Sequence, residues 1–292
     1  MRYLLLLIGV FACATSVIFI KIGSTHPIAL SAYRLLLGGL CLLPLAIAPW
    51  RRRGELRTGL ILKQALPPAL FLGIHFITWI IGARMTPSAN ASLIVNMVPV
   101  VMPFLLLVVV EERITRAEGA GTLLGMTGVV LLGLGDLNLS PEYAMGDLVC
   151  FLSMLFYAFY LIYARKNREM ASIYLYVVPV YLIAGIFCLA IAILLHLSGH
   201  EIGWIGPDLR LEWISILGLA LVPTVLGHSL INWALTRIRG QAVVIINLAQ
   251  FIFAGIMGYL LLDEIPALVF YISSALVVVG AVIVIRQSHT AS

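Results

Sequence analysis

Residues 83–112 read ARMTPSANASLIVNMVPVVMPFLLLVVVEE, and this stretch decides the fold. Between Arg84 and Glu111 the chain carries no charged residue. A helix rises about 1.5 Å per residue and the hydrocarbon core of a bilayer is about 30 Å thick, so this run is long enough to cross a membrane. Two consecutive carboxylates then mark its end. The stretch therefore predicts a transmembrane helix over residues 90–111.

Nine further stretches of similar length and composition surround this one. Of the 292 residues, 62% are hydrophobic and only 11% are charged, and the mean hydropathy is +1.09, far more apolar than a soluble domain. Because lipid offers no hydrogen-bond partner to the backbone, such spans must be helices, and the alternation expected of barrel strands is absent. We predict an all-α membrane protein with ten transmembrane helices. The expected spans are residues 2–22, 28–48, 63–84, 90–111, 117–136, 144–164, 172–197, 211–235, 241–262 and 267–286.

The positive charges predict how the chain is oriented. With the N-terminus in the cytoplasm, only Lys21, Arg84 and Arg210 of the 18 Lys and Arg residues fall on the other side, and Arg34 lies inside a span. Cytoplasmic loops of membrane proteins carry an excess of Lys and Arg. We therefore expect a multi-pass protein of a bacterial inner membrane with both termini in the cytoplasm. Because the basic residues gather at helix ends and form no basic stripe, nucleic acid is not an expected partner.

A second stretch, ALTRIRGQAVVIINLAQFIFAGIMGYLLLDE at residues 234–264, repeats the first. Asn96 recurs 151 residues later as Asn247, and Glu112 recurs 152 residues later as Glu264. The alternative is chance similarity between apolar helices. A duplicated unit of five helices has an odd number of spans, so its second copy must enter the membrane from the opposite side. Inverted repeats of this kind enclose a shared site at the midplane of many transporters. The expected repeats are residues 1–137 and 138–292, arranged around a central cavity.

A set of residues spread over both halves suggests a family. In the first half the set is Phe19, Lys21, Pro27 and Arg34, residues 83–91, Pro99, residues 112–115, and Gly121, Gly125 and Gly128, and in the second half it is residues 234–242, residues 264–266 and Gly280. Through these residues the chain resembles the EamA unit of the drug/metabolite transporter superfamily, and within it the YddG-type amino acid exporters. The chain departs from the pattern where Phe251 takes the place of Pro99 in the second half. The resemblance implies a ten-helix exporter of small metabolites, with the first, third and fourth helices of each half lining a cavity.

Polar side chains inside spans are costly and point to an interior cavity unless a local partner explains them. Several recur at helical spacing, so that they share one face of their span. Single Ser and Thr residues are more often hydrogen bonds between helices, whereas amides and imidazoles have more groups to satisfy than one neighbour supplies. The predicted cavity residues are His75, Thr78, Trp79, Asn96, Tyr157, His228, Asn232, Asn247 and Gln250.

Three other residues carry specific expectations. Arg34 either binds a substrate carboxylate or ties the first two helices to a carbonyl or loop, and the second role is favoured. Pro99 and Pro103 remove two backbone donors from one helix, which predicts a break or hinge in the fourth span.

The inventory favours export of amino acids, including aromatic and neutral ones, by alternating access and facilitated diffusion. All 13 acidic residues lie at span ends or in loops, so no embedded carboxylate is available as a proton carrier. The alternative is a proton-coupled multidrug or metabolite antiporter that uses His75 or His228. Without HExxH, GxSxG or CxxC motifs, an intramembrane enzyme and a zinc site are disfavoured, and a channel is a further rival. We expect no cofactor or metal, a small-molecule substrate, the lipid bilayer as the only other partner, and a functional monomer.

Overall fold

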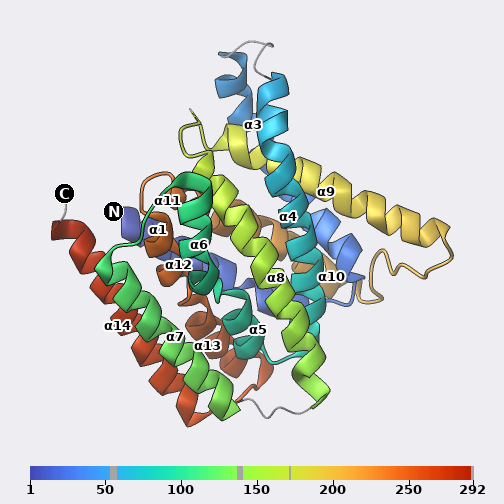
Figure 1. Ribbon diagram of the computed structural model, residues 1–292. Coiled ribbons are helices and arrows are strands. Elements are labelled where there is room, and N and C mark those ends of the chain that lie inside the picture. The colour runs from blue at the N-terminus through green and yellow to red at the C-terminus, as the bar shows by residue number, and fades with distance from the viewer. Residues whose placement is uncertain (53–57, 137–140, 171, 291–292) are drawn as a thin grey trace.

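The computed structural model describes residues 1–52, 58–136, 141–170 and 172–290, and in these residues the chain is helical, with no β-strand. The elements run in the order α1 (Arg2–Ala14), α2 (Ser16–Ile22), α3 (Pro27–Arg51), α4 (Thr58–Met85), α5 (Ser88–Val95), α6 (Val98–Val110), α7 (Arg116–Asp136), α8 (Pro141–Lys166), α9 (Tyr174–Leu197), α10 (Leu209–Leu219), the π-helix η2 (Ala220–His228), α11 (Ser229–Leu235), α12 (Gly240–Asn247), α13 (Gln250–Leu262) and α14 (Leu268–Thr290). Figure 1 shows how these helices are arranged.

Nine stretches of the described residues are long and apolar enough to cross a membrane, which confirms an all-α membrane protein. They are Arg2–Ile22, Pro27–Arg51, Gly59–Met85, Ser88–Val110, Glu142–Lys166, Tyr174–Leu197, Leu209–Leu235, Gly240–Leu262 and Leu268–Arg286. The tenth expected span, residues 117–136, coincides with α7, a helix of 21 residues that is not among the nine. The number ten therefore remains a prediction.

Two spans are broken near their middle in the same way. The fourth consists of α5 and α6, with 8 and 13 residues. The ninth consists of α12 and α13, again with 8 and 13 residues. The first break lies at Asn96 and Met97, and the second at Leu248 and Ala249. Each short helix thus ends, at Val95 or Asn247, where the expected cavity begins.

The strongest helix contacts join the first 137 residues to the rest of the chain. Helix α4 packs along α8, α3 along α9, and α7 along α14, and the last pair lies side by side at one edge of Figure 1. Helix α1 lies against η2 and α11, while α5 contacts α13 and α6 contacts α12. Small residues allow these close approaches, since a Cβ at Gly82 would meet Cys150 Sγ at 2.6 Å. The two predicted repeats are therefore interleaved rather than side by side.

Candidate substrate cavity

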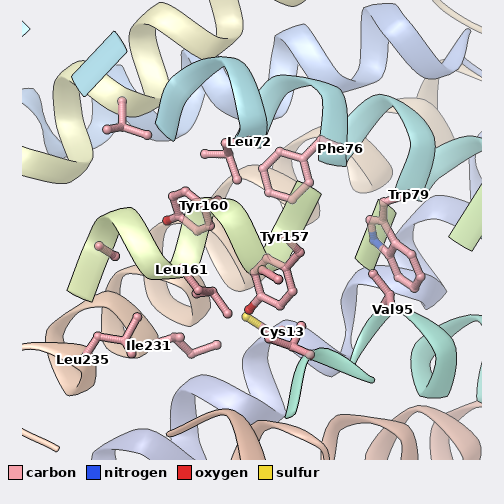
Figure 2. Packing of buried hydrophobic residues seen from close by; sticks show 14 of the residues in the cluster. Cys13, Leu72, Phe76, Trp79, Val95, Tyr157, Tyr160, Leu161, Ile231 and Leu235 are labelled. Atoms are coloured by element: carbon pink, nitrogen blue, oxygen red, sulfur yellow. The ribbon is translucent and has the colours of Figure 1, made fainter. Parts of the chain in front are cut away.

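A small cavity of about 20 Å³ lies where the two predicted repeats meet. It is close to the smallest space that holds one water molecule. Its lining is Cys13, Ser16, His75, Phe76, Trp79, Val95, Asn96, Tyr157, His228 and Gln250. Figure 2 shows Tyr157, Phe76 and Trp79 in the packed region around it. Six of the nine predicted cavity residues, namely His75, Trp79, Asn96, Tyr157, His228 and Gln250, therefore line one space.

Three buried amides form a chain of hydrogen bonds beside the cavity. Asn247 Nδ2 donates to Asn96 Oδ1 at 2.8 Å, and Gln250 Nε2 donates to Asn247 Oδ1 at 2.6 Å. Asn96 Nδ2 donates to Ser92 O, one turn back along its own helix, at 2.7 Å. Asn96 directly follows α5 and Asn247 is the last residue of α12. The breaks in the two spans therefore bring the two asparagines into contact.

Two imidazoles flank the ring of Tyr157. The His75 ring is stacked on it with centroids 4.7 Å apart, and the His228 ring meets its edge at 5.7 Å. His75 Nδ1 lies 2.8 Å from Ser153 Oγ, whereas His228 Nδ1 has no hydrogen-bond partner among the described residues. This corner of the site therefore presents aromatic surface together with one unsatisfied polar nitrogen.

Arg34 is fully buried directly behind the cavity wall. Its Nη1 donates to Ser16 Oγ at 3.3 Å, and its Nε donates to Thr224 Oγ1 at 3.1 Å. Its Cζ lies 3.8 Å from the centre of the Phe76 ring. Within the described part of the chain no carboxylate pairs with it, and Nη2 has no partner. An unpaired buried charge is costly, and two hydroxyls and the Phe76 ring contact this one.

The remaining predicted site residues lie outside the cavity lining. Thr78 Oγ1 bonds back to the carbonyls of Ile74 and His75 in its own helix. Asn232 is buried and donates to Tyr160 Oη and to His228 O. Asn247 is one step behind the wall, where it holds Asn96 and Gln250.

The two prolines have different local consequences. The break at Asn96 and Met97 comes just before Pro99, which lies in the first turn of α6. Pro103 lies inside α6 without a break. Because proline has no N–H, the carbonyl of Pro99 loses its usual partner within the helix, and it accepts from Gln241 Nε2 at 3.0 Å instead. A parallel case is Pro223 in η2, where Thr224 Oγ1 donates to Leu219 O at 2.8 Å.

Sequence reasoning missed several parts of the site. Cys13, which reads as a packing residue, lines the cavity, and so does Phe76. The π-helix, a form frequent at functional sites, was not expected either. Its one local signal is Pro223 within an apolar span. Among the described residues no group of three or more His, Cys, Asp or Glu side chains could hold a metal ion.

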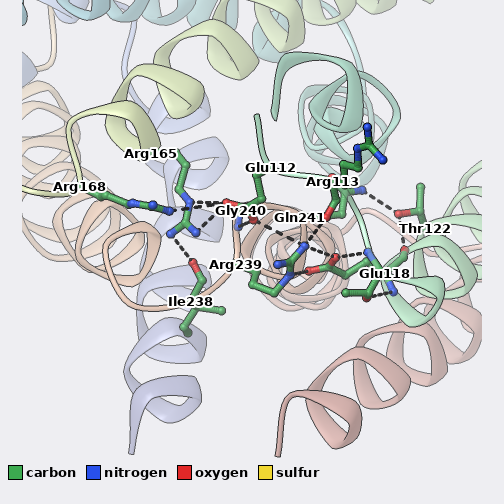
Figure 3. A network of polar contacts seen from close by, with 11 residues as sticks. Glu112, Arg113, Glu118, Thr122, Arg165, Arg168, Ile238, Arg239, Gly240 and Gln241 are labelled. Carbon is green, nitrogen blue, oxygen red and sulfur yellow. Dashed lines mark hydrogen bonds and ion pairs between the residues drawn. The ribbon is translucent and has the colours of Figure 1, made fainter. Parts of the chain in front are cut away.

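Two polar networks lie at opposite ends of the molecule. At one end Glu264 pairs with Lys21, near Tyr143 in the first turn of α8. At the other end Glu112 pairs with Arg165 in the last turn of α8. Figure 3 shows this second network, in which Arg239 also bonds to the buried Glu118. Since Arg165 follows Tyr143 by 22 residues in α8, the two ends are about 33 Å apart along its axis.

Known proteins resemble this chain over almost its whole length. A curated relative from Ancylobacter novellus, described as an aromatic amino acid exporter YddG, is 28% identical over 250 residues, which cover 81% of this chain and 78% of the relative. An uncharacterized transporter from Archaeoglobus fulgidus is 25% identical over 92% of this chain and 91% of its own. One solved structure matches with a TM-score of 0.75 at 18% identity, covering 97% of this chain and 96% of that chain, which shows a shared fold.

The family model is matched twice, once in each predicted repeat. The model of the EamA-like transporter family matches residues 1–134 and again residues 144–286. These matches, with the membrane-spanning helices and the polar cavity between them, indicate a transporter of small molecules rather than an enzyme. This chain belongs to the EamA-like transporter family.

Proposed function

We propose that this protein exports amino acids, foremost those with aromatic or other apolar side chains, by alternating access across a bacterial inner membrane. The observation that carries the proposal is the cavity itself, where amides, imidazoles and aromatic rings from both halves converge. Sites of this kind bind the apolar part of a small ligand on aromatic surface and orient it through a few polar groups. The name of the Ancylobacter relative points the same way.

The proposed framework is two inverted repeats of five helices, residues 1–137 and 138–292, with both termini in the cytoplasm and α7 as the tenth span. Matching broken helices of 8 and 13 residues support this arrangement. The contact between Asn96 and Asn247 supports it as well, because residues related by a twofold axis meet only on that axis. A twofold axis also requires helix contacts between the halves to occur in equivalent pairs. The first span of the first half packs on the third span of the second half, as α1 on η2, and the first span of the second half packs on the third span of the first half, as α8 on α4.

The proposed substrate pose assigns one part of an amino acid to each side of the cavity. Arg34 Nη2 is the proposed partner of the substrate carboxylate, next to Ser16, whose Oγ also accepts from Trp79 Nε1 at 3.2 Å. The Tyr157 ring and the two imidazoles are the proposed surface for the side chain. Asn96, Asn247 and Gln250 would bind the ammonium group through their amide oxygens.

An amino acid does not fit in the cavity as it stands. Pockets for small ligands usually measure about 300–1,000 Å³, while this space measures about 20 Å³. Since the polar networks at both ends are formed, we assign this conformation to the closed state of the proposed carrier. Binding would require the two halves to separate on one side, which is the motion that alternating access assumes.

Facilitated diffusion is the proposed mode of transport, because the acidic residues near the two ends take part in the closing networks and not in the cavity lining. A proton-coupled antiporter is the second candidate. Two observations favour it. His228 Nδ1 has no hydrogen-bond partner among the described residues, and the centres of the His75 and His228 rings lie 6.4 Å apart. The two histidines would then carry the proton that the carboxylates cannot.

Counterflow in proteoliposomes tests the proposal. Vesicles loaded with unlabelled L-phenylalanine should transiently accumulate external labelled phenylalanine above its equilibrium level, since a carrier with a saturable site exchanges the two. Replacing His228 by Ala should abolish this overshoot. Replacing the exposed His196 by Ala should leave the overshoot intact. A linear influx that does not depend on the internal amino acid would instead identify a channel, and the absence of any flux with all twenty amino acids would reject the substrate class.

A further inference from the structure

Two carboxylates, Glu112 and Glu264, occupy matching positions at opposite ends of the protein. Each follows a residue in the left-handed region, Glu111 with φ 56° or Asp263 with φ 55°, that ends a long half-helix. Such a backbone is unfavourable for residues other than glycine, and it occurs nowhere else outside glycine in the described residues. The two turns also share their hydrogen bonding. The N–H groups of residues 111 and 112 donate to Leu106 O, and those of residues 263 and 264 donate to Gly258 O.

Each carboxylate holds the N-terminus of a short half-helix from the other repeat. Glu264 Oε2 accepts from the backbone N–H of Ser88, the first residue of α5, at 3.0 Å, and its Oε1 accepts from Ser88 Oγ at 3.0 Å. Glu112 Oε1 accepts from the backbone N–H of Gly240, the first residue of α12, at 3.1 Å. A carboxylate is stabilised at a helix N-terminus by the free N–H groups and the helix dipole.

A cation from the first span of a repeat completes each contact. Lys21, in the last turn of α2, lies 2.6 Å from Glu264 Oε1. Arg165, in the last turn of α8, lies 2.7 Å from Glu112 Oε2. Figure 3 shows the Glu112 network, to which Arg168 and Arg239 add longer ion pairs of 3.8 and 3.9 Å. At each end, one carboxylate thus joins three segments, namely the first span of one repeat and one half-helix from each of the two broken spans.

The far end of each short half-helix reaches the cavity. Helix α5 begins at the Glu264 contact and leads to Asn96, while α12 begins at the Glu112 contact and ends at Asn247. The two asparagines are hydrogen-bonded to each other. A short rigid helix therefore connects each closing network with the place where a substrate would take over the hydrogen bonds of the asparagines.

From this geometry we infer that Glu112 and Glu264 are a pair of positioning residues in the transport cycle, each of which closes the cavity to one face of the membrane. Release of Glu264 frees α5 and opens only its end, and release of Glu112 frees α12 and opens only the other. The inference rests on the proposed function, since a carrier must close its cavity to one face of the membrane at a time.

The native Cys13 thiol provides a reporter that needs no substrate. It lines the cavity, and the space of about 20 Å³ admits no thiol reagent while both ends are closed. The protein would carry Cys13 as its single cysteine, with Cys41, Cys150 and Cys188 replaced by Ala, in sealed vesicles of known orientation. A membrane-impermeant trimethylammonium-ethyl methanethiosulfonate is applied to one face at a time. Glu264→Gln should raise the rate of Cys13 modification about tenfold from one face. Glu112→Gln should raise it similarly from the opposite face.

Matched controls separate this effect from a loss of charge or of folding. Glu111→Gln and Asp263→Asn remove the same charge one residue away, from exposed side chains, and should leave the rate unchanged from both faces. Lys21→Met should act from the same face as Glu264→Gln. The inference is overturned if the two glutamate variants admit the reagent from the same face, or if neither changes the rate. Because no substrate is involved, opposite sidedness without any counterflow would reject the proposed function and keep the inference.

Discussion

At the scale of single residues, the chemistry of the cavity follows from which polar groups the helices leave unsatisfied. Sequence spacing predicted that the imidazoles and amides converge, because those groups need several partners. His75, His228, Asn96 and Gln250 line one cavity, whereas Asn232 and Asn247 lie outside its lining. Sequence spacing could not separate Thr78, which bonds to its own helix, from Trp79, which lines the cavity, because they follow His75 by three and four residues and both lie one turn away from it. It also favoured a structural role for Arg34, whose Nη2 has no partner in the described part of the chain.

Replacing Arg34 by Gln should impair phenylalanine transport without a comparable loss of thermal stability. If Nη2 binds the substrate carboxylate, the loss of charged hydrogen bonds should raise the KM for phenylalanine by about 10- to 100-fold. Phenethylamine, which lacks the carboxylate, serves as the comparison and should compete equally well against both proteins. A purely structural role would instead lower the thermal stability and affect both compounds alike. Transport kinetics together with thermal unfolding distinguish the two.

The contact between Asn96 and Asn247 should appear as an energetic coupling. Each single Ala variant loses the same hydrogen bond, so the double variant should be more stable than the sum of the two losses predicts, by about 0.6 kcal/mol and at most about 1.7 kcal/mol. Unfolding in mixed detergent micelles measures the three free energies. Asn167, whose side chain donates to Tyr163 O four residues earlier, offers a control, and its Ala variant should add independently to that of Asn247. Additivity of the Asn96 and Asn247 variants would contradict the contact.

At the scale of elements, the helices were more predictable than their interruptions. Each of the ten expected spans is helical in the described residues, since length and apolarity alone dictate helices in lipid. Pro99 signalled the break in the fourth span, but the ninth breaks at Leu248 and Ala249 without a proline. That second break depends on tertiary contacts, which no local pattern records. In η2 the local pattern is Pro223 followed by Thr224, whose Oγ1 donates to Leu219 O, and this pattern does not by itself distinguish a π-helix from an α-helix.

The crossing of α4 and α8 offers a test of this packing. A Cβ at Gly82 would lie 2.6 Å from Cys150 Sγ, 3.0 Å from the backbone atom Cys150 N and 3.1 Å from the backbone atom Gly146 O. The two backbone atoms cannot turn away as the end of a flexible side chain could. Gly82→Ala should therefore force the helices apart and destabilise the protein by about 1–3 kcal/mol. Gly59→Ala, in the same helix with no atom near the added Cβ, should be neutral or slightly stabilising. Equal melting temperatures of the two variants would contradict the close crossing.

At the scale of the whole molecule, ion pairs join the helices at both ends of the protein, and a cavity of only about 20 Å³ lies between them. The inverted repeat stays a prediction, whereas the sequence predicted the membrane class and the transporter family, because composition indicates the first and similarity along the chain indicates the second. It could not predict how the repeats interleave, since apolar helices offer few distinguishing contacts. Nor could it predict the closing networks, because Glu112 and Glu264 read simply as helix ends.

Facilitated diffusion makes a prediction about energy coupling. Proteoliposomes with a pH gradient should reach the same final internal phenylalanine concentration as vesicles without one, because facilitated diffusion moves no proton with or against the substrate. Vesicles whose pH gradient is collapsed by an ionophore are the control. Accumulation of phenylalanine above its external concentration, lost on addition of the ionophore, would identify the proton-coupled alternative.

The central claim is the antiparallel duplication, and the sidedness of two equivalent residues tests it most directly. Arg113 and Ile265 are both exposed, and each directly follows one of the two closing carboxylates. In a protein whose four native cysteines are replaced by Ala, a single Cys is introduced at one position or the other and probed in intact cells with a membrane-impermeant maleimide. We expect labelling of Ile265→Cys in intact cells, and labelling of Arg113→Cys only after the membrane is opened. Labelling of both from the same face would contradict the account.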